Sequence, residues 1–231
     1  MKRFYKEAAA YNLMGHWTVL LDMKPIVTPL KNKFILSSEA LAKEVAEEWK
    51  AQTDELMTDT MPLTKLANTL IDKISNKHLR IAMSEEIIKY ATSDLVCYFA
   101  ERPEDLVALQ KERWLPLTEW VHNEFEIEFK TVAGIQYIDQ EGDSINKVRK
   151  IIKDMSPLAF AVMQNLTSIT GSFVISLALI KGRINAEEAY LAAFVDDIYQ
   201  LQKWGSDDEA ERRLKAVKED IIMSRHFYDI S

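Results

Sequence analysis

The chain has 231 residues, of which 48% are hydrophobic and 28% charged, and its formal net charge is −7. This length can form one large domain or two small ones with a proper core, and the composition is that of an ordinary globular protein. The negative charge argues against a general nucleic-acid binder, which needs a basic surface. The single cysteine, Cys97, excludes an internal disulfide and a cysteine-built zinc site, and its apolar neighbours predict a buried, inert thiol.

The amino terminus, MKRFYKEAAAYN, contains no apolar stretch of signal-peptide length and no long presequence rich in Arg and Ser. We therefore expect a cytoplasmic protein of a bacterium. A mature organellar protein would begin in the same way, so the source stays open.

Residues 4–36 predict a small antiparallel sheet. The short β-rich runs HWTVLLD, KPIVTP and NKFIL are separated by residues that favour turns, among them Pro25 and Pro29. Ser37 or Ser38 then caps a helix in which apolar residues recur every four positions up to Trp49. Strands and one helix make an N-terminal α/β unit of residues 1–58, and the polar stretch 53–60 is the predicted linker.

Residues 59–231 predict a larger, mainly helical domain, so the fold class is α+β. Pro62 and Pro103 each suit the first turn of a helix, whereas Pro116 should bend or interrupt the second of these helices. Three further segments are expected to be ordered: a helix or strand at 95–100, with helix favoured, a strand at 126–131, and a short amphipathic helix at 143–153.

The centre of the domain is predicted at residues 158–204. Residues 158–180 carry no charge and should form a buried helix, which the polar run 165–172 can divide in two. Asn185 and Glu188 predict a capping box that starts one helix reaching Trp204, and Ser206 with Glu209 predicts a second box before a last helix that ends near residue 225. Residues 158–180 are also long enough to cross a membrane, but their polar middle disfavours insertion, so no stable membrane insertion is expected.

No motif of a familiar enzyme class is present: the four histidines are scattered, and the chain lacks metalloprotease, nucleophile-elbow, P-loop and dinucleotide-binding patterns. The most suggestive polar cluster consists of Asp196, Asp197, Gln200, Trp204, Asp207, Asp208 and Glu209. Three interpretations are open: a solvated acidic edge that complements a helix dipole, a surface that binds a partner, and a metal or acid–base site. Trp204 is the tryptophan expected to be exposed; Trp17, Trp49, Trp114 and Trp120 are expected in the core.

Several separate segments, in order along nearly the whole chain, form a recognisable set. They are RFYKEA at 3–8, VLLD at 19–22 with Pro25 and Thr28-Pro29, MPLTKLANTLID at 61–72, SDLVCYFAE at 93–101, TGSFVISLAL at 170–179 and VDDIYQLQKWGSDDEAERR at 195–213. Together these segments resemble the ATP12 family of F1 ATP synthase assembly chaperones. The chain has Val195-Asp196-Asp197 where Val-Asp-Glu is expected, and residues 11–15 and 134–143 match least.

The resemblance implies a non-enzymatic, monomeric chaperone that needs no cofactor or metal. It would bind the unassembled F1 α subunit and cover the surface destined for the β subunit. It implies the same two-part fold, with the segment 61–72 packed in the helical core. The predicted contact residues are Asp196, Asp197, Gln200, Trp204, Asp207 and Glu209, with Glu47 and Trp49 as weaker candidates at the domain junction.

Two other functions remain as alternatives. One is a metal-dependent enzyme that uses the carboxylates of Asp196, Asp197, Asp207, Asp208 and Glu209 around a hard divalent cation. The other is a peripheral membrane adaptor that uses residues 158–180.

Overall fold

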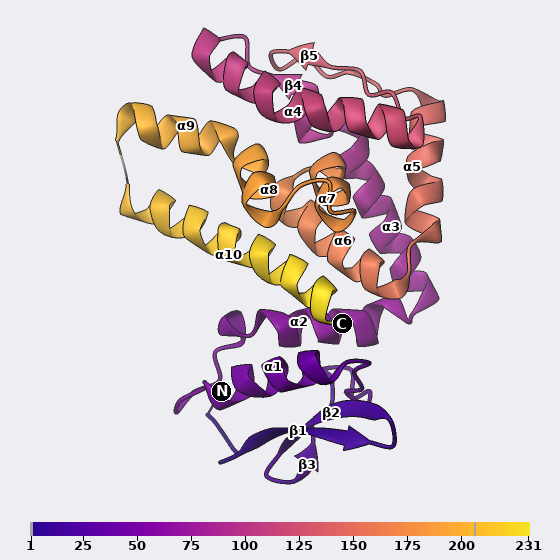
Figure 1. Cartoon of the computed structure of the whole chain (residues 1–231), viewed down its shortest axis with the longest axis vertical. Coiled ribbons are helices and arrows are strands. Elements are labelled where there is room, and N and C mark those ends of the chain that lie inside the picture. The colour runs from indigo at the N-terminus through magenta and orange to yellow at the C-terminus, as the bar shows by residue number, and fades with distance from the viewer. Residues whose placement is uncertain (1, 206) are drawn as a thin grey trace. The chain divides into compact units, whose positions relative to one another are not determined.

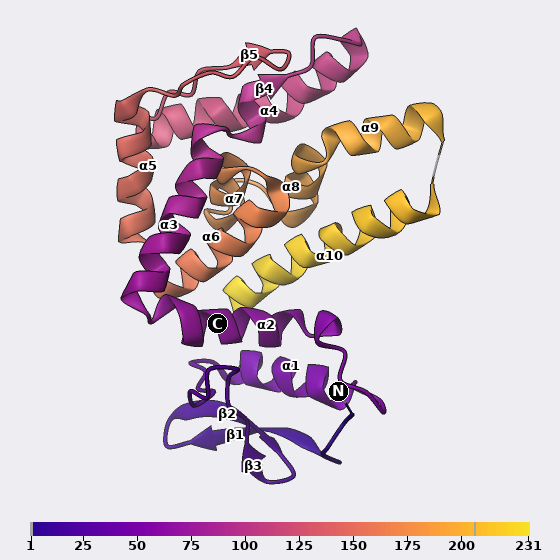
Figure 2. The same cartoon turned by 180° about the vertical axis from the view of Figure 1, so that it is seen from behind.

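The computed structural model describes residues 2–205 and 207–231, which form two compact units. The N-terminal unit comprises Met1–Arg80, Pro157–Val162 and Met223–Ser231, and the helical unit comprises Ile81–Ser156 and Met163–Ile222. A few strands near the N-terminus are followed by helices along most of the chain (Figure 1; seen from behind in Figure 2), which confirms the predicted α+β class. A domain boundary after residue 58 stays a prediction.

The N-terminal unit begins with an antiparallel sheet of three strands in the order β1 (Ala8–Leu13), β2 (His16–Leu21) and β3 (Lys24–Pro25). Helix α1 (Glu39–Lys50) packs on β1 and β2. Its N-cap is Ser38, whose hydroxyl accepts the backbone N–H of Leu41 at 3.3 Å, as the sequence predicts.

The strands differ in part from the prediction. The run NKFIL forms no strand, only isolated bridges that join Val27 to Lys33 and Trp17 to Leu36, whereas β1 was not predicted. Its sequence AAAYNL has little intrinsic strand preference. Pairing with β2 along its whole length and the cover that α1 provides decide its conformation.

Helix α2 (Pro62–Thr69) starts with Pro62 in its first turn, as predicted. The carboxylate of Glu48 in α1 accepts the N–H groups of Leu63 (2.7 Å) and Thr64 (2.8 Å), so α1 caps α2. A π-helical turn (Leu70–Ile74) follows, and its buried Asp72 accepts hydrogen bonds from three residues of the loop after β3: Thr28, Leu30 and Asn32. The segment 61–72 therefore contributes to the core of the N-terminal unit.

The remaining elements are mainly helices. Two are 3-10 turns, η1 (Thr58–Thr60) and η3 (Leu95–Cys97), and two are short strands, β4 (Tyr98–Phe99) and β5 (Val132–Ala133). The α-helices are α3 (Lys77–Thr92), α4 (Glu104–Phe125), α5 (Gly142–Asp154), α6 (Pro157–Thr170), α7 (Phe173–Ile180), α8 (Ala186–Ala193), α9 (Val195–Trp204) and α10 (Asp208–Ile230). The predicted amphipathic helix is α5, and α10 extends beyond the predicted end near residue 225. None of the helices in the described part of the chain is both long and apolar enough to span a membrane.

All eight residues of α7 are buried, and the chain breaks between α6 and α7 as predicted. Gly171 adopts a left-handed φ of +68°, and the Ser172 hydroxyl accepts the N–H of Ile175 at 3.0 Å. The fully buried carboxylate of Asp94 accepts the N–H groups of Val174 (3.0 Å) and Val96 (3.3 Å). Asp94 thus joins η3 to the start of α7.

The single helix predicted up to Trp204 is wrong, because it breaks at Phe194 (φ −116°, ψ 26°) into α8 and α9. The indole N–H of buried Trp114, in α4, donates to the carbonyl of Ala192 at 2.8 Å. This tertiary hydrogen bond occupies a backbone acceptor at the end of α8. The capping box of Asn185 and Glu188 at the start of α8 is confirmed.

Pro116 does not interrupt α4, so of the predicted bend or interruption the interruption is wrong. Pro116 is exposed, so water can satisfy the carbonyl that its missing N–H leaves free. The Thr118 hydroxyl also donates to the carbonyl of Leu115 at 3.0 Å. For residues 95–100, the favoured prediction of a helix is confirmed only in part, because the helical turn η3 leads directly into strand β4.

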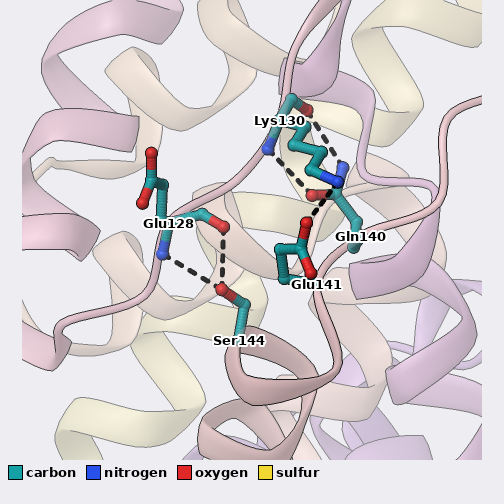
Figure 3. A network of polar contacts seen from close by, with 5 residues as sticks. All are labelled: Glu128, Lys130, Gln140, Glu141 and Ser144. Carbon is teal, nitrogen blue, oxygen red and sulfur yellow. Dashed lines mark hydrogen bonds and ion pairs between the residues drawn. The ribbon is translucent and has the colours of Figure 1, made fainter.

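Residues 126–131 form no strand, which is a further correction; the strand is β5, and it pairs in parallel with β4. Side chains hold the segment instead (Figure 3). Ser144 bonds both backbone groups of Glu128, and Gln140 bonds both backbone groups of Lys130, which also pairs with Glu141. Glu126 adopts a left-handed conformation at the end of α4, so the chain turns away before a strand can form.

Burial raises the pKa of the Asp94 carboxyl from 3.8 to about 6, against the effect of the hydrogen bonds it accepts. The folded state therefore holds this proton more tightly than the unfolded state does. The associated stability is present below about pH 4 and is lost as the pH rises through 6. Relative to Asp94→Asn, the wild-type free energy of unfolding should fall by about 2 kcal/mol between pH 4 and pH 7, as measured by urea titration. Exposed Asp154, changed to Asn, is the control; an equal pH dependence in all three proteins would contradict the assignment.

Candidate partner-binding surface

Helix α9 contains four of the predicted contact residues, and its first turn is anchored to α4 by Gln110. The side chain of Gln110, only 1% exposed, accepts the N–H of Ala100 at 2.7 Å and donates to the Asp196 carboxylate at 2.7 Å. Asp196 therefore points toward the interior of the helical unit. Its role in the structure is to hold α9 against α4.

Asp197, the neighbour of Asp196, faces α10 instead. It forms an ion pair with Arg213, and both side chains remain partly exposed. A second ion pair, Lys218 with Glu187 at 2.6 Å, links α10 to α8. Asp196 and Asp197 thus point to different sides of α9, as expected of adjacent helical residues.

The end of α9 is held by Asp105 at the start of α4. Its carboxylate accepts the Tyr199 hydroxyl at 2.7 Å and pairs with Lys203 at 2.7 Å. The hydrogen bonds from Lys203 and then Tyr199 lower the pKa of Asp105 to about 2. This carboxylate is therefore ionised at neutral pH.

The outer side of α9 exposes Gln200 and Trp204, whose side chain is 77% exposed. Asp197, Gln200 and Trp204 are spaced by three and four residues and so lie along one side of the helix. Trp204 is exposed as predicted and Trp114 is buried as predicted, whereas Trp17, Trp49 and Trp120 are only half-buried.

The acidic start of α10 and the end of α9 lie on the same side of the helical unit (Figures 1 and 2). Asp207 and Glu209 are exposed, and the Asp207 carboxylate accepts the N–H of Glu209 at 3.1 Å. The capping box predicted for Ser206 lies outside the described residues. Five of the six main predicted residues are thus on or beside an exposed end of the helical unit, and Asp196 is turned inward.

Glu47 and Trp49 lie in α1, in the N-terminal unit. Glu47 pairs with Lys50 at 2.6 Å, and both side chains are exposed. The Trp49 ring packs against Tyr5, with 5.6 Å between centroids. Trp49 is therefore part of the packing of its own unit.

Sequence reasoning did not assign the residues that support α9, namely Asp105, Gln110 and Arg213. Asp105 and Gln110 are about 90 positions away in the chain, and no local pattern indicates such contacts. Arg213 is present in the family-like segment 195–213, which was the only available signal.

The acidic residues do not converge. Asp196, Asp197 and Asp105 each have a different partner: an amide, a guanidinium, and a hydroxyl with an ammonium. Within residues 2–205 and 207–231, no group of three or more His, Cys, Asp or Glu side chains could hold a metal ion.

Residues 2–122 match the model of the ATP12 chaperone protein family, which is just over half of the chain. The chain belongs to the ATP12 chaperone family. The matched range ends before α9, but whole-chain comparisons extend the similarity. The crystal structure of Atp12 from Paracoccus denitrificans superimposes with a TM-score of 0.86 at 32% identity and covers 99% of this chain and 97% of that one.

Two other relatives are similar to the chain over most of its length. The crystal structure of the Atu1473 protein from Agrobacterium tumefaciens has a TM-score of 0.87 at 35% identity, covering 99% of this chain and 85% of that one. The mitochondrial protein atp12 of Schizosaccharomyces pombe is 26% identical over 220 residues, which is 90% of this chain and 75% of the relative. The family assignment confirms the resemblance identified from the sequence.

In this ATP12-family chaperone, Gln110→Leu should lower the free energy of unfolding by about 1–3 kcal/mol. The substitution leaves the Ala100 N–H and the Asp196 carboxylate without their shared partner. Gln202→Leu, at an exposed position of α9, is the control and should change stability by less than about 0.5 kcal/mol. Urea denaturation measures both; equal effects would show that Gln110 is not a structural link.

Proposed function

We propose that this ATP12-family chaperone binds the unassembled F1 α subunit and shields the surface that later contacts the β subunit. Membership in the family supports an assembly chaperone. The observation that carries the choice of surface is Trp204, a large aromatic residue 77% exposed beside carboxylates at the end of α9. An obligate subunit interface exposes a large apolar patch when its partner is absent, and aromatic anchors are suited to cover it.

The proposed contact surface consists of Asp197, Gln200, Trp204, Asp207 and Glu209, and Asp196 is proposed as the residue that positions it. Its charge is suited to reversible binding, because carboxylates at a rim accelerate association with a basic partner without sealing the interface. The ion pair of Asp197 with Arg213 is partly exposed and contributes little stability by itself. Asp197 can therefore exchange Arg213 for a cation of the client at small cost. Asp196 would act through the position of α9, because it is bonded to Gln110.

Glu47 and Trp49 are proposed as weaker contacts on the N-terminal unit. Glu47 is exposed and pairs only locally with Lys50, so it is available to a client. Trp49 is half-buried against Tyr5 and would contribute one edge of its ring.

We further infer that the protein catalyses no reaction and uses no metal or cofactor. The separate protein partners of Asp196, Asp197 and Asp105 support this reading over an enzyme built on the acidic cluster. A monomer in the bacterial cytoplasm is the proposed working form. The close structural relatives from Paracoccus denitrificans and Agrobacterium tumefaciens support the bacterial origin.

Freshly diluted F1 α subunit should scatter less light in the presence of the wild-type protein, and the two chains should co-elute in gel filtration. Trp204→Ala should weaken the interaction at least tenfold, as loss of an aromatic anchor does. Ile222→Ala, which removes a 41%-exposed side chain from α10, should act like the wild type.

The outcomes separate the two parts of the proposal. If the wild-type protein neither suppresses scattering nor co-elutes, F1 α is not the client. If it does both and Trp204→Ala is equally active, the client binds elsewhere than at the end of α9.

A further inference from the structure

A groove of about 700 Å³ lies between α4 and the small parallel sheet of β4 and β5 in the helical unit. One wall is formed by Val107, Lys111 and Leu115, which are four residues apart and so share one side of α4. The facing wall contains Phe99 of β4 and Val132 of β5. Figures 1 and 2 show α4 running beside the two strands.

The walls of the groove combine apolar and polar side chains, and the apolar ones are accessible. Leu115 is 39% exposed, and Val107 and Val132 are half-buried. Within the described residues, β5 pairs only with β4, so its other edge presents unpaired backbone groups. The chain that continues from β5 is also apolar and exposed, with Ile135 fully exposed and Tyr137 63% exposed.

The charge of the groove is opposite to that of the protein. Arg102 and Lys111 line it and are exposed, and neither side chain has a hydrogen-bond or ion-pair partner among residues 2–205 and 207–231. Glu101 is the one acidic residue among the described lining, and its carboxylate lies against Gly134, where an added Cβ would come within 2.8 Å of it. Two unpaired cations on a chain of net charge −7 favour a ligand that carries carboxylates.

We propose that this groove binds an extended segment of another polypeptide whose groove-facing residues, every second one along the segment, alternate between apolar and acidic. The apolar side chains pack on Val107, Leu115 and Val132, and the carboxylates pair with Arg102 and Lys111. A strand-like segment fits because β5 offers an open edge along which main-chain hydrogen bonds can form. The groove is a second binding surface, made of residues other than those of the α9 surface.

The test uses a fluorescein-labelled synthetic peptide of three Val-Ser-Glu-Ser repeats, which presents Val and Glu in turn on one face, and a second peptide with Lys in place of Glu. Fluorescence anisotropy with the full chain should show saturable binding of the acidic peptide and much weaker binding of the basic one. Lys111→Glu should weaken binding of the acidic peptide about fivefold or more. Lys150→Glu, the same charge change at an exposed position of α5, should leave it within twofold.

The apolar wall is tested separately by Leu115→Asp, with Ile222→Asp as the control of similar exposure. Only Leu115→Asp should weaken binding, and circular dichroism must show that both variants are folded. Amide NMR shifts on titration should be largest at Lys111, Val132 and Ala133.

Equal binding by Lys111→Glu and Lys150→Glu, or shifts confined to α9, would overturn the proposal. So would a dimer of this chain that Lys111→Glu dissociates, because the groove would then bind a second copy. Loss of F1 α binding in Trp204→Ala leaves the groove assignment unaffected, so failure of one assignment is distinguishable from failure of the other.

Discussion

The helical unit depends on how the backbone N–H groups at the buried start of α7 find hydrogen-bond acceptors. All eight residues of this helix are buried, so water cannot reach the amide groups of its first turn. Asp94 and Ser172 supply the missing acceptors, and Asp94 does so at the cost of burying a carboxylate. Because α7 contacts both α4 and α8, this one connection determines where the two helices that lead to the α9 surface can lie.

Helix α4 then presents two different surfaces. Asp105, Gln110 and Trp114 point to α8 and α9 and are joined to them by hydrogen bonds of 2.7–2.8 Å. Val107, Lys111 and Leu115 occupy another side and form one wall of the groove with β4 and β5. A single helix, uninterrupted at Pro116, therefore supports both surfaces proposed to bind other polypeptides.

The two surfaces are complementary in chemistry. The α9 surface combines an exposed tryptophan with carboxylates, whereas the groove combines apolar walls with unpaired cations. A chaperone for an unassembled subunit must cover apolar surface and still release it, which favours several moderate contacts over one permanent interface. Exposed ion pairs such as Asp197 with Arg213 suit this purpose because they can be exchanged at small cost in free energy.

The sequence by itself determined what depends on neighbouring residues: the Ser38 cap, the Asn185–Glu188 box, the break before α7, and the exposure of Trp204 beside Gly205. Each is encoded within a few positions, where hydrogen-bonding and helical spacing act directly. Motifs spread over the chain also identified the family. Tertiary structure alone decided that β1 is a strand, that the helix breaks at Phe194, that residues 126–131 are not a strand, and that Asp196 points inward. In these cases the deciding partners, such as β2, Trp114, Ser144 and Gln110, are distant in sequence, so folding must bring them together before they can act.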